Sequence, residues 1–152
     1  MVGYAVIDNE ELVRYGVFKT PSSKNVMKRI SYIIEFLDDL LHEYNSNIVV
    51  GLEDTQESGM NTNTFQLLTK VLGAIEFWLY TENISYMVCH ISSWRKHSGI
   101  KGKRRKEKKA NAIKAVKEKF GINAEEDAAE AILIAYYVKH QTQTNEEGWS
   151  AD

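Results

Sequence analysis

The chain has 152 residues, of which 43% are hydrophobic and 26% are charged, so it can bury a core and is not a disordered chain. No apolar run reaches the ~20 residues that span a bilayer, and no basic segment followed by an apolar stretch opens the chain, so we expect a cytoplasmic protein. The net charge of -2 conceals a segment, residues 95–119, with 12 of the 19 Lys and Arg and two acids; that segment carries +10 and the rest -12.

The first third of the chain predicts a hairpin followed by a helix. Residues 2–8 and 12–18 are apolar runs on either side of a tight turn at 9–11, which predicts two antiparallel strands. The Pro-Ser-Ser at 21–23 breaks this pattern and can cap a helix. Apolar residues at helical spacing extend that helix to about Tyr44.

The middle third predicts two strands that enclose a helix. Residues 48–53 form a short apolar run, typical of a strand buried on both faces in a parallel sheet, and a polar loop follows at 54–63. The apolar residues of the next helix, 64–80, spread too widely for one face, so we expect its second face to form a homodimer contact. The next strand, 84–90, contains Cys89, which we interpret as a buried thiol in a reducing compartment and not as a zinc ligand.

The last third predicts a basic helix and then an acidic one. A basic loop at 92–109 leads into a helix at 106–119. Asn123 can cap the final helix, which we expect to end near His140.

The order of these elements predicts an α/β protein. Strands alternate with helices, and the early hairpin makes the sheet mixed. Neither an internal repeat nor a dividing linker is present, so we expect one domain, 1–140, and a flexible tail, 141–152.

The basic segment predicts a nucleic-acid surface. A cationic strip binds phosphates in a salt-dependent way, whereas the alternative is a solvated Lys-rich helix face. Trp94 and His97 could stack on bases, although packing beneath the loop is the simpler role for Trp94. The predicted phosphate-binding residues are Arg95, Lys96, Lys101, Lys103, Arg104, Arg105, Lys106, Lys108 and Lys109.

Three carboxylates predict a metal site. Asp127 and Glu130 lie three residues apart in an apolar run and so share one face of a mostly buried helix. The alternative, an acidic helix N-terminus, does not account for Glu130. Glu53 ends a strand, where ligand-binding groups gather in α/β sheets. Together they predict a site for Mg²⁺, with Mn²⁺ as a substitute; two such ions about 3.5–4 Å apart can align a water and a leaving oxygen for phosphodiester hydrolysis.

Three segments resemble the RuvC-type Holliday-junction resolvases of the ribonuclease H-like superfamily, most closely the compact phage-encoded members. Gly-Tyr-Ala-Val-Ile at 3–7 resembles the family's second strand, and Val-Val-Gly-Leu-Glu at 49–53 resembles the strand that ends in a catalytic Glu. Asp-Ala-Ala-Glu-Ala at 127–131 resembles the closing Asp-Ala-Ala-Asp-Ala helix. The resemblance implies a ribonuclease H-like mixed sheet flanked by helices. It also implies Mg²⁺-dependent cleavage of four-way DNA junctions by a homodimer in a bacterium or a phage-infected host.

The resemblance assigns catalysis and metal binding to Glu53, Asp127 and Glu130, with three departures from the family. The usual first strand, with its catalytic Asp, has no counterpart in the chain; a late start or a truncation would account for this, and so would Asp8 as a substitute metal ligand. Glu130 replaces an Asp and can still coordinate Mg²⁺. Gln56 stands where bacterial members carry an aromatic wedge, so a wedge mechanism does not carry over.

Other functions remain open at this point. The absent first carboxylate would suit a non-catalytic junction-binding protein, and a ribonuclease H-like nuclease could act instead on hybrids, flaps or forks. A third alternative is a metal-free domain whose basic strip binds an acidic protein. For catalysis, Lys106 and Lys109 are the best candidates to stabilise the transition state, because they lie shortly before the acidic helix.

Overall fold

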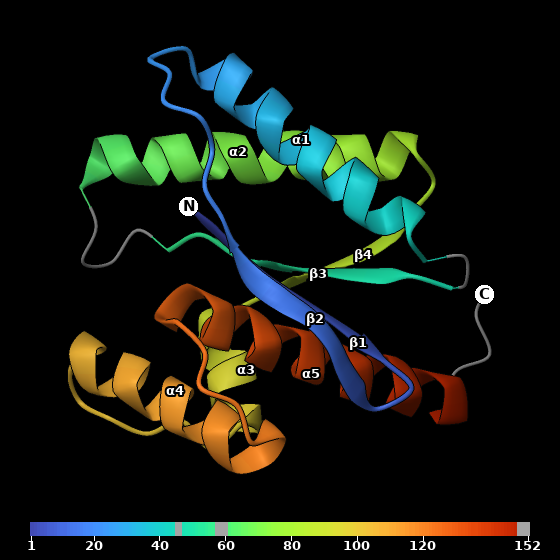
Figure 1. Cartoon of the computed structure of the whole chain (residues 1–152), viewed down its shortest axis with the longest axis vertical. Coiled ribbons are helices and arrows are strands. Elements are labelled where there is room, and N and C mark those ends of the chain that lie inside the picture. Colours follow the sequence, from blue (N-terminus) through green and yellow to red (C-terminus); the bar gives the residue numbers. More distant parts are fainter. Residues whose placement is uncertain (45–46, 57–60, 149–152) are drawn as a thin grey trace. The chain divides into compact units, whose positions relative to one another are not determined.

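The computed structural model describes residues 1–44, 47–56 and 61–148, with side chains described as far as residue 143. The chain forms two compact units, one made of Met1–Phe18 with Ile91–Asp152 and the other of Lys19–His90. Each unit contains a two-stranded sheet and helices (Figure 1). One sheet is antiparallel and the other parallel, so the predicted mixed α/β class is confirmed. The predicted bounds 1–140 and 141–152 stay a prediction.

The first unit begins with a hairpin of β1 (Val2–Asp8) and β2 (Glu11–Phe18). The strands are antiparallel, and their register places Asp8 opposite Glu11. The loop between them consists of Asn9 and Glu10, both with positive φ (48° and 71°), as a two-residue turn between twisted strands requires. The predicted hairpin and its turn are therefore confirmed.

The core of the first unit lies around α5 (Glu126–Gly148), which contacts β1, β2, α3 and α4. Ile132 and Leu133 are fully buried, and each contributes roughly 1.5–3 kcal/mol by leaving water. The expectation that this helix is mostly buried is confirmed. Its other buried side chains are Ala128, Ala129, Ile134 and Val138.

Both predicted ends of α5 are wrong. The helix begins at Glu126, so Asn123 lies too far before it to act as the cap. It continues past His140 to Gly148, because residues 141–147 include no helix breaker. The Thr142 hydroxyl donates to the Val138 carbonyl at 3.1 Å, a bond that the helix accommodates.

Two further helices, α3 (Ile91–His97) and α4 (Arg105–Phe120), complete the first unit. The predicted basic helix is confirmed, and it ends at Gly121, whose φ of 72° suits the left-handed C-cap position. The prediction of a loop beginning at residue 92 is wrong over α3. This short helix buries Trp94 completely, and a single apolar side chain gives no periodic signal in the sequence.

The second unit contains β3 (Val49–Glu53) and β4 (Ser85–Cys89), which are parallel, together with α1 (Val26–His42) and α2 (Thr62–Thr81). The parallel pair is confirmed. The prediction that β3 is buried on both faces is wrong, because Val49 is 38% exposed and no β3 residue is buried.

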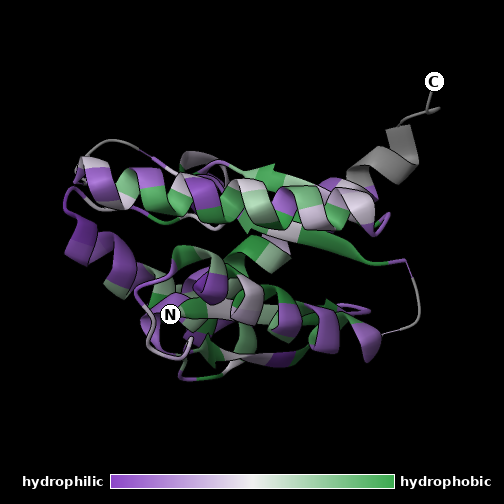
Figure 2. Cartoon of the chain, turned by 90° about the horizontal axis from the view of Figure 1, so that it is seen from above, coloured by the Kyte–Doolittle hydropathy of each residue, from purple (hydrophilic) through white to green (hydrophobic). Residues whose placement is uncertain are grey.

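The start of α1 also differs from the prediction. Asn25 caps the helix by accepting a bond from the Lys28 N–H at 3.2 Å, so the Pro-Ser-Ser at 21–23 lies before the cap. The Ser23 hydroxyl instead accepts from the Asn25 N–H. Hydrophilic and hydrophobic residues alternate along the helices (Figure 2), and no helix in the described ranges is long and apolar enough to cross a membrane.

Candidate functional site

Glu53 lies at the carboxyl end of the parallel sheet, as predicted. It is the last residue of β3 and pairs in register with Cys89 of β4. The Asp54 N–H donates to the Cys89 carbonyl at 2.9 Å, which continues the pairing one residue further. Burial and then the charge of Glu53 raise the pKa of the Cys89 thiol to about 11. The thiol is 1% exposed, so the predicted buried cysteine is confirmed, whereas Glu53 itself is exposed.

The loop after Glu53 is fastened to its own unit. The Gln56 amide nitrogen lies 3.2 Å from Nε2 of His90, and the hydroxyls of Thr55 and Thr69 lie 3.0 Å apart. Gln56 is therefore a hydrogen-bonding residue at the position where an aromatic wedge would stand. Residues 57–60 of the predicted loop fall outside the described residues, and its last two residues, Thr62 and Asn63, belong to α2 instead.

The other two carboxylates lie on the first two turns of α5. A hydrogen bond or ion pair to the Asp127 carboxylate is not found in the described part of the chain, and the residue is only partly exposed. Its backbone packs directly against β1 at Gly3. The two lie so close that a Cβ on Gly3 would overlap the Asp127 carbonyl oxygen. Only glycine permits this approach of strand to helix.

Glu130 is more deeply placed and faces a cation. Its Oε1 lies 3.6 Å from Nη2 of Arg95 on α3, and the two side chains are 14% and 15% exposed. That oxygen is buried and accepts no hydrogen bond from the described residues. The Arg95 guanidinium also lies over the Trp94 ring, 5.2 Å from its centroid.

A second cation meets the start of α5. Lys109 of α4 forms an ion pair with Glu126. Glu126 and Glu130 therefore each have a basic partner within the unit, and Asp127 between them has none among the described residues. Lys109 is one of the two lysines predicted to aid catalysis. Its partner Glu126 directly precedes Asp127 in the sequence.

The arrangement leaves the magnesium site a prediction. Within neither unit do three His, Cys, Asp or Glu side chains of the described ranges gather closely enough to hold a metal ion. Glu53 belongs to one unit, and Asp127 and Glu130 belong to the other. The unpaired Asp127 carboxylate and the Glu130 oxygen without a hydrogen bond are the kind of donors that Mg²⁺ takes. Asp8, exposed at the end of β1, stays an alternative prediction.

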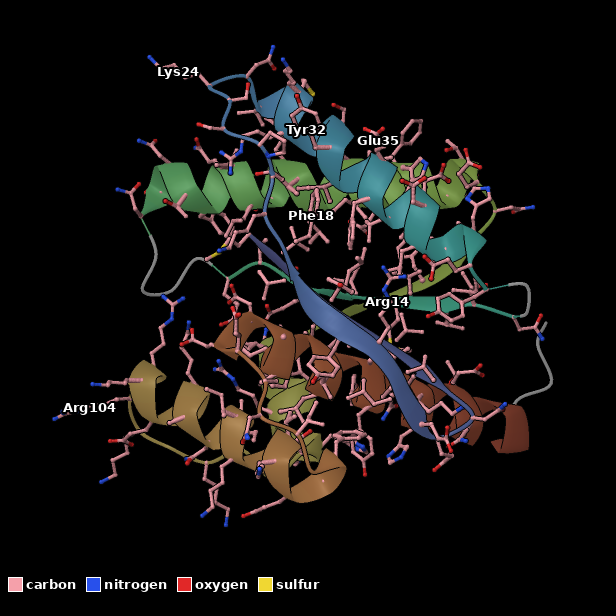
Figure 3. The ribbon with its side chains drawn as sticks, viewed as in Figure 1. Arg14, Phe18, Lys24, Tyr32, Glu35 and Arg104 are labelled. Atoms are coloured by element: carbon pink, nitrogen blue, oxygen red, sulfur yellow. The ribbon has the colours of Figure 1, made fainter. Side chains whose placement is uncertain are left out.

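The basic strip, which lies within residues 95–119, includes the segment between α3 and α4. Glu107 Oε2 accepts from the Lys103 N–H at 3.0 Å, and the Asn111 amide donates to the Lys101 carbonyl at 2.5 Å, so this segment is tied to the helix. Arg104 precedes α4 and makes no side-chain cap; its side chain points away from the ribbon (Figure 3). The exposed members of the strip are Lys96, Lys101, Lys103, Arg104, Arg105 and Lys106, whereas Lys108 and Lys109 are partly buried.

The aromatic residues of this region differ in access. Trp94 is completely buried, so its ring packs in the core and is not available to stack on a base. His97 is exposed, and its Nε2 lies 2.8 Å from Nδ1 of His140. Arg95, predicted to bind phosphate, faces Glu130 instead of solvent.

Sequence reasoning missed two features of this site. The Arg95–Glu130 pair joins residues 35 positions apart, and nothing in the pattern singles out Arg95 among its basic neighbours. The close approach of Gly3 to Asp127 was weakly indicated in the sequence, because a glycine inside a strand often marks close contact with another backbone.

Comparison with known proteins identifies the fold. No protein-family model and no curated protein matches the sequence. Among solved structures, Thermus thermophilus RuvC in complex with Holliday junction substrate is similar, with a TM-score of 0.69 and 14% identity over 93% of this chain and 87% of that one. Another Thermus thermophilus RuvC structure gives 0.68 and 15% over 94% and 88%. The chain therefore has a RuvC-like fold of the ribonuclease H-like type.

Proposed function

We propose that the chain is a structure-selective DNA endonuclease that resolves four-way junctions by Mg²⁺-dependent phosphodiester hydrolysis. The observation that carries the proposal is the likeness, over 93% of the chain, to a RuvC structure that contains a Holliday junction substrate. The positions of the carboxylates support it. Glu53 ends a strand, and Asp127 and Glu130 stand on the first turns of a buried helix.

Glu53, Asp127 and Glu130 are the residues that would hold the metal ion, with Asp8 as a further candidate. Bound magnesium, or manganese in its place, supplies positive charge to the phosphate and makes water a better nucleophile. These residues would contribute oxygen ligands; Asp127 and Glu130 are partly closed to water, whereas Glu53 and Asp8 are exposed. The Asp127 carboxylate has no ion-pair partner among the described residues.

The DNA-binding surface that we propose is the exposed part of the basic strip. Arg104 and Arg105 stand at the start of α4, where backbone N–H groups also favour phosphate. The hydrogen bonds from the segment 101–103 to α4 hold these cations in place before DNA binds. Contacts of this kind position an enzyme on DNA and carry no sequence information.

The active form that we propose is a homodimer formed through α2. Phe77 and Tyr80 are 69% and 74% exposed, and a Cβ on Gly73 would meet nothing within 4 Å. These three residues follow one another at helical spacing, so they form an exposed stripe with a small residue at one end. Two subunits would allow two strands of a junction to be cut together.

Cleavage of a labelled four-way junction tests the proposed activity. We expect Mg²⁺ or Mn²⁺ to support cutting by the wild-type chain, and Glu53→Gln or Asp127→Asn to lower its rate by about 100-fold or more, because ~3 kcal/mol of transition-state stabilisation is lost. Binding by Asp127→Asn should stay intact or tighten, since a charge that repels phosphate is removed. Glu118→Gln, on an exposed carboxylate paired with Lys114, is the matched control.

The same assay separates the alternatives. Binding of the junction without cutting, equally in wild type and Glu53→Gln, would make the chain a non-catalytic junction-binding protein. Preferential cutting of an RNA–DNA hybrid, a flap or a fork would make it another nuclease of this fold. Loss of binding in Asp127→Asn would show that Asp127 is structural.

A further inference from the structure

The contact between α3 and α5 holds a cation and an anion that are both largely withdrawn from water. Arg95 Nη2 and Glu130 Oε1 lie 3.6 Å apart, and the side chains are 15% and 14% exposed. The fully buried Trp94 ring supports the guanidinium from one side. A charged pair at this depth is maintained only when each charge is compensated.

The pair is electrostatically matched but incompletely hydrogen-bonded. The 3.6 Å separation exceeds a charge-assisted hydrogen bond, and both Glu130 Oε1 and Arg95 Nε are buried without a hydrogen-bond partner. Trp94 Nε1 and Ser98 Oγ share this condition. Within the described residues, all the buried side-chain polar atoms of this kind lie on α3, on the residue that follows it, or on α5. Glu130 therefore keeps acceptor capacity that Arg95 does not use.

The charges around Glu130 indicate which kind of partner its unused oxygen could bind. Asp127, one helical turn before Glu130, has no cationic partner in the described chain, while Lys109 takes Glu126. Arg95 is thus the positive charge that offsets Glu130 beside an uncompensated Asp127. A divalent cation bound by Asp127 and Glu130 would also compensate the negative charge of Glu130, at a shorter distance than Arg95 does.

We infer that Arg95 is a positioning residue that competes with the divalent cation for Glu130. In the metal-free protein the guanidinium holds the Glu130 carboxylate in place and prevents an uncompensated buried charge. Metal binding exchanges one positive partner of Glu130 for another. Arg95 therefore lowers the affinity of the site for the cation while keeping the empty site folded. This inference rests on the proposed metal-dependent function.

Calorimetric titration with Mn²⁺ tests this competition without an activity assay. We expect Arg95→Gln to bind Mn²⁺ about tenfold more tightly than wild type, a difference of ~1.4 kcal/mol. Lys114→Gln makes the same change in net charge at an exposed position of α4 and should stay within about twofold of wild type. Unchanged or weaker Mn²⁺ binding by Arg95→Gln, beside normal binding by wild type, would overturn the inference and leave the proposed function standing. Absence of Mn²⁺ binding in every variant would overturn both.

A measurement on the wild-type chain keeps the inference testable if Arg95→Gln does not fold. The side-chain Nε–H resonance of Arg95 can be followed by NMR during a Mg²⁺ titration, with Arg95→Lys used to assign it. We expect the resonance to shift as Mg²⁺ saturates the site, because the guanidinium loses its carboxylate partner. A resonance that does not move at saturation would show that the Arg95–Glu130 pair survives metal binding, against the inference.

Discussion

At the scale of single residues, His97 makes the stability of the chain depend on pH. The partial burial of the ring, followed by the nearby His140 and Lys119, lowers the pKa of His97 below its ordinary value of 6.5. The unfolded chain therefore takes up a proton at a pH where the folded chain does not, and the free energy of unfolding falls as the pH drops through about 6.5. We expect His97→Gln to lose less stability between about pH 7 and pH 5 than wild type, as measured by chemical denaturation.

A second histidine supplies a control of opposite sign. The backbone hydrogen bond and the charge of Asp38 raise the pKa of His42, so the folded chain binds its proton more readily than the unfolded chain. Its contribution is present at low pH and disappears as the pH rises through its folded pKa. His42→Gln should therefore make the acid-induced loss of stability steeper. Equal pH dependence in both variants and wild type would contradict these assignments.

The residues of the candidate site were predictable to different degrees. The position of Glu53 at a strand end follows from a short apolar run that stops at an acid, and Asp127 with Glu130 follows from helical spacing. The partners of these carboxylates did not follow, because contacts such as Arg95–Glu130 depend on how α3 packs on α5. Local patterns give the face of a helix, and tertiary packing gives what that face meets.

At the scale of elements, the approach of β1 to α5 predicts an effect of Gly3. A Cβ there would overlap the Asp127 carbonyl oxygen, so Gly3→Ala must move strand or helix. We expect a loss of ~1–3 kcal/mol, which lowers Tm by roughly 3–10 °C in a thermal unfolding experiment. Gly73→Ala, measured at a concentration where the chain is monomeric, is the matched control: within one chain a Cβ meets nothing within 4 Å there, so helix propensity should raise stability by about 0.5–1 kcal/mol. Equal Tm values in the two variants would refute the steric argument.

The start of α4 predicts a salt effect. Neutralising Arg104 and Arg105 together should weaken junction binding and reduce the slope of log K against log salt by up to about two, because each phosphate that a cation neutralises adds roughly 0.9 to the slope. Binding titrations at several salt concentrations measure this slope. Replacing Lys24 and Lys28, exposed lysines outside the strip, with Gln makes the same charge change and should leave the slope unaltered. An unaltered slope in the arginine variant would show that these side chains do not contact the DNA backbone.

The elements themselves were largely predictable, and the exceptions have physical causes. Apolar runs located both hairpin strands, helical spacing located α1, an apolar-rich segment located α2, and composition located α4. The short α3 was missed because seven residues with one deeply buried side chain contain too little pattern. The cap of α1 was misplaced because Ser23 and Asn25 are both good caps, and only the Asn25 side chain reaches the helix N–H groups.

At the scale of the whole molecule, the order of elements was enough to predict the fold class, which the RuvC structures share. Assembly depends on exposed surface, which a sequence pattern indicates only indirectly. The excess of apolar residues in α2 suggested a second contact face, and the exposure of Phe77 and Tyr80 gives that suggestion particular residues. In a symmetric dimer each of these residues occurs in both subunits, so the interface would bury two copies of Phe77 and two of Tyr80.

Because each substitution is present in both subunits, a charge introduced on α2 should weaken the dimer strongly. Replacing Phe77 and Tyr80 with Glu removes two aromatic side chains from each subunit's side of the interface and places like charges near the symmetry axis, so we expect the dimer to weaken by at least about 100-fold, some 2–3 kcal/mol. Sedimentation should find the wild type at twice the mass of one chain and the variant at the mass of one. Met27→Glu, at a 56% exposed apolar residue of α1, is the control and should remain dimeric. A monomeric wild type, or a variant that still dimerises, would remove α2 as the interface.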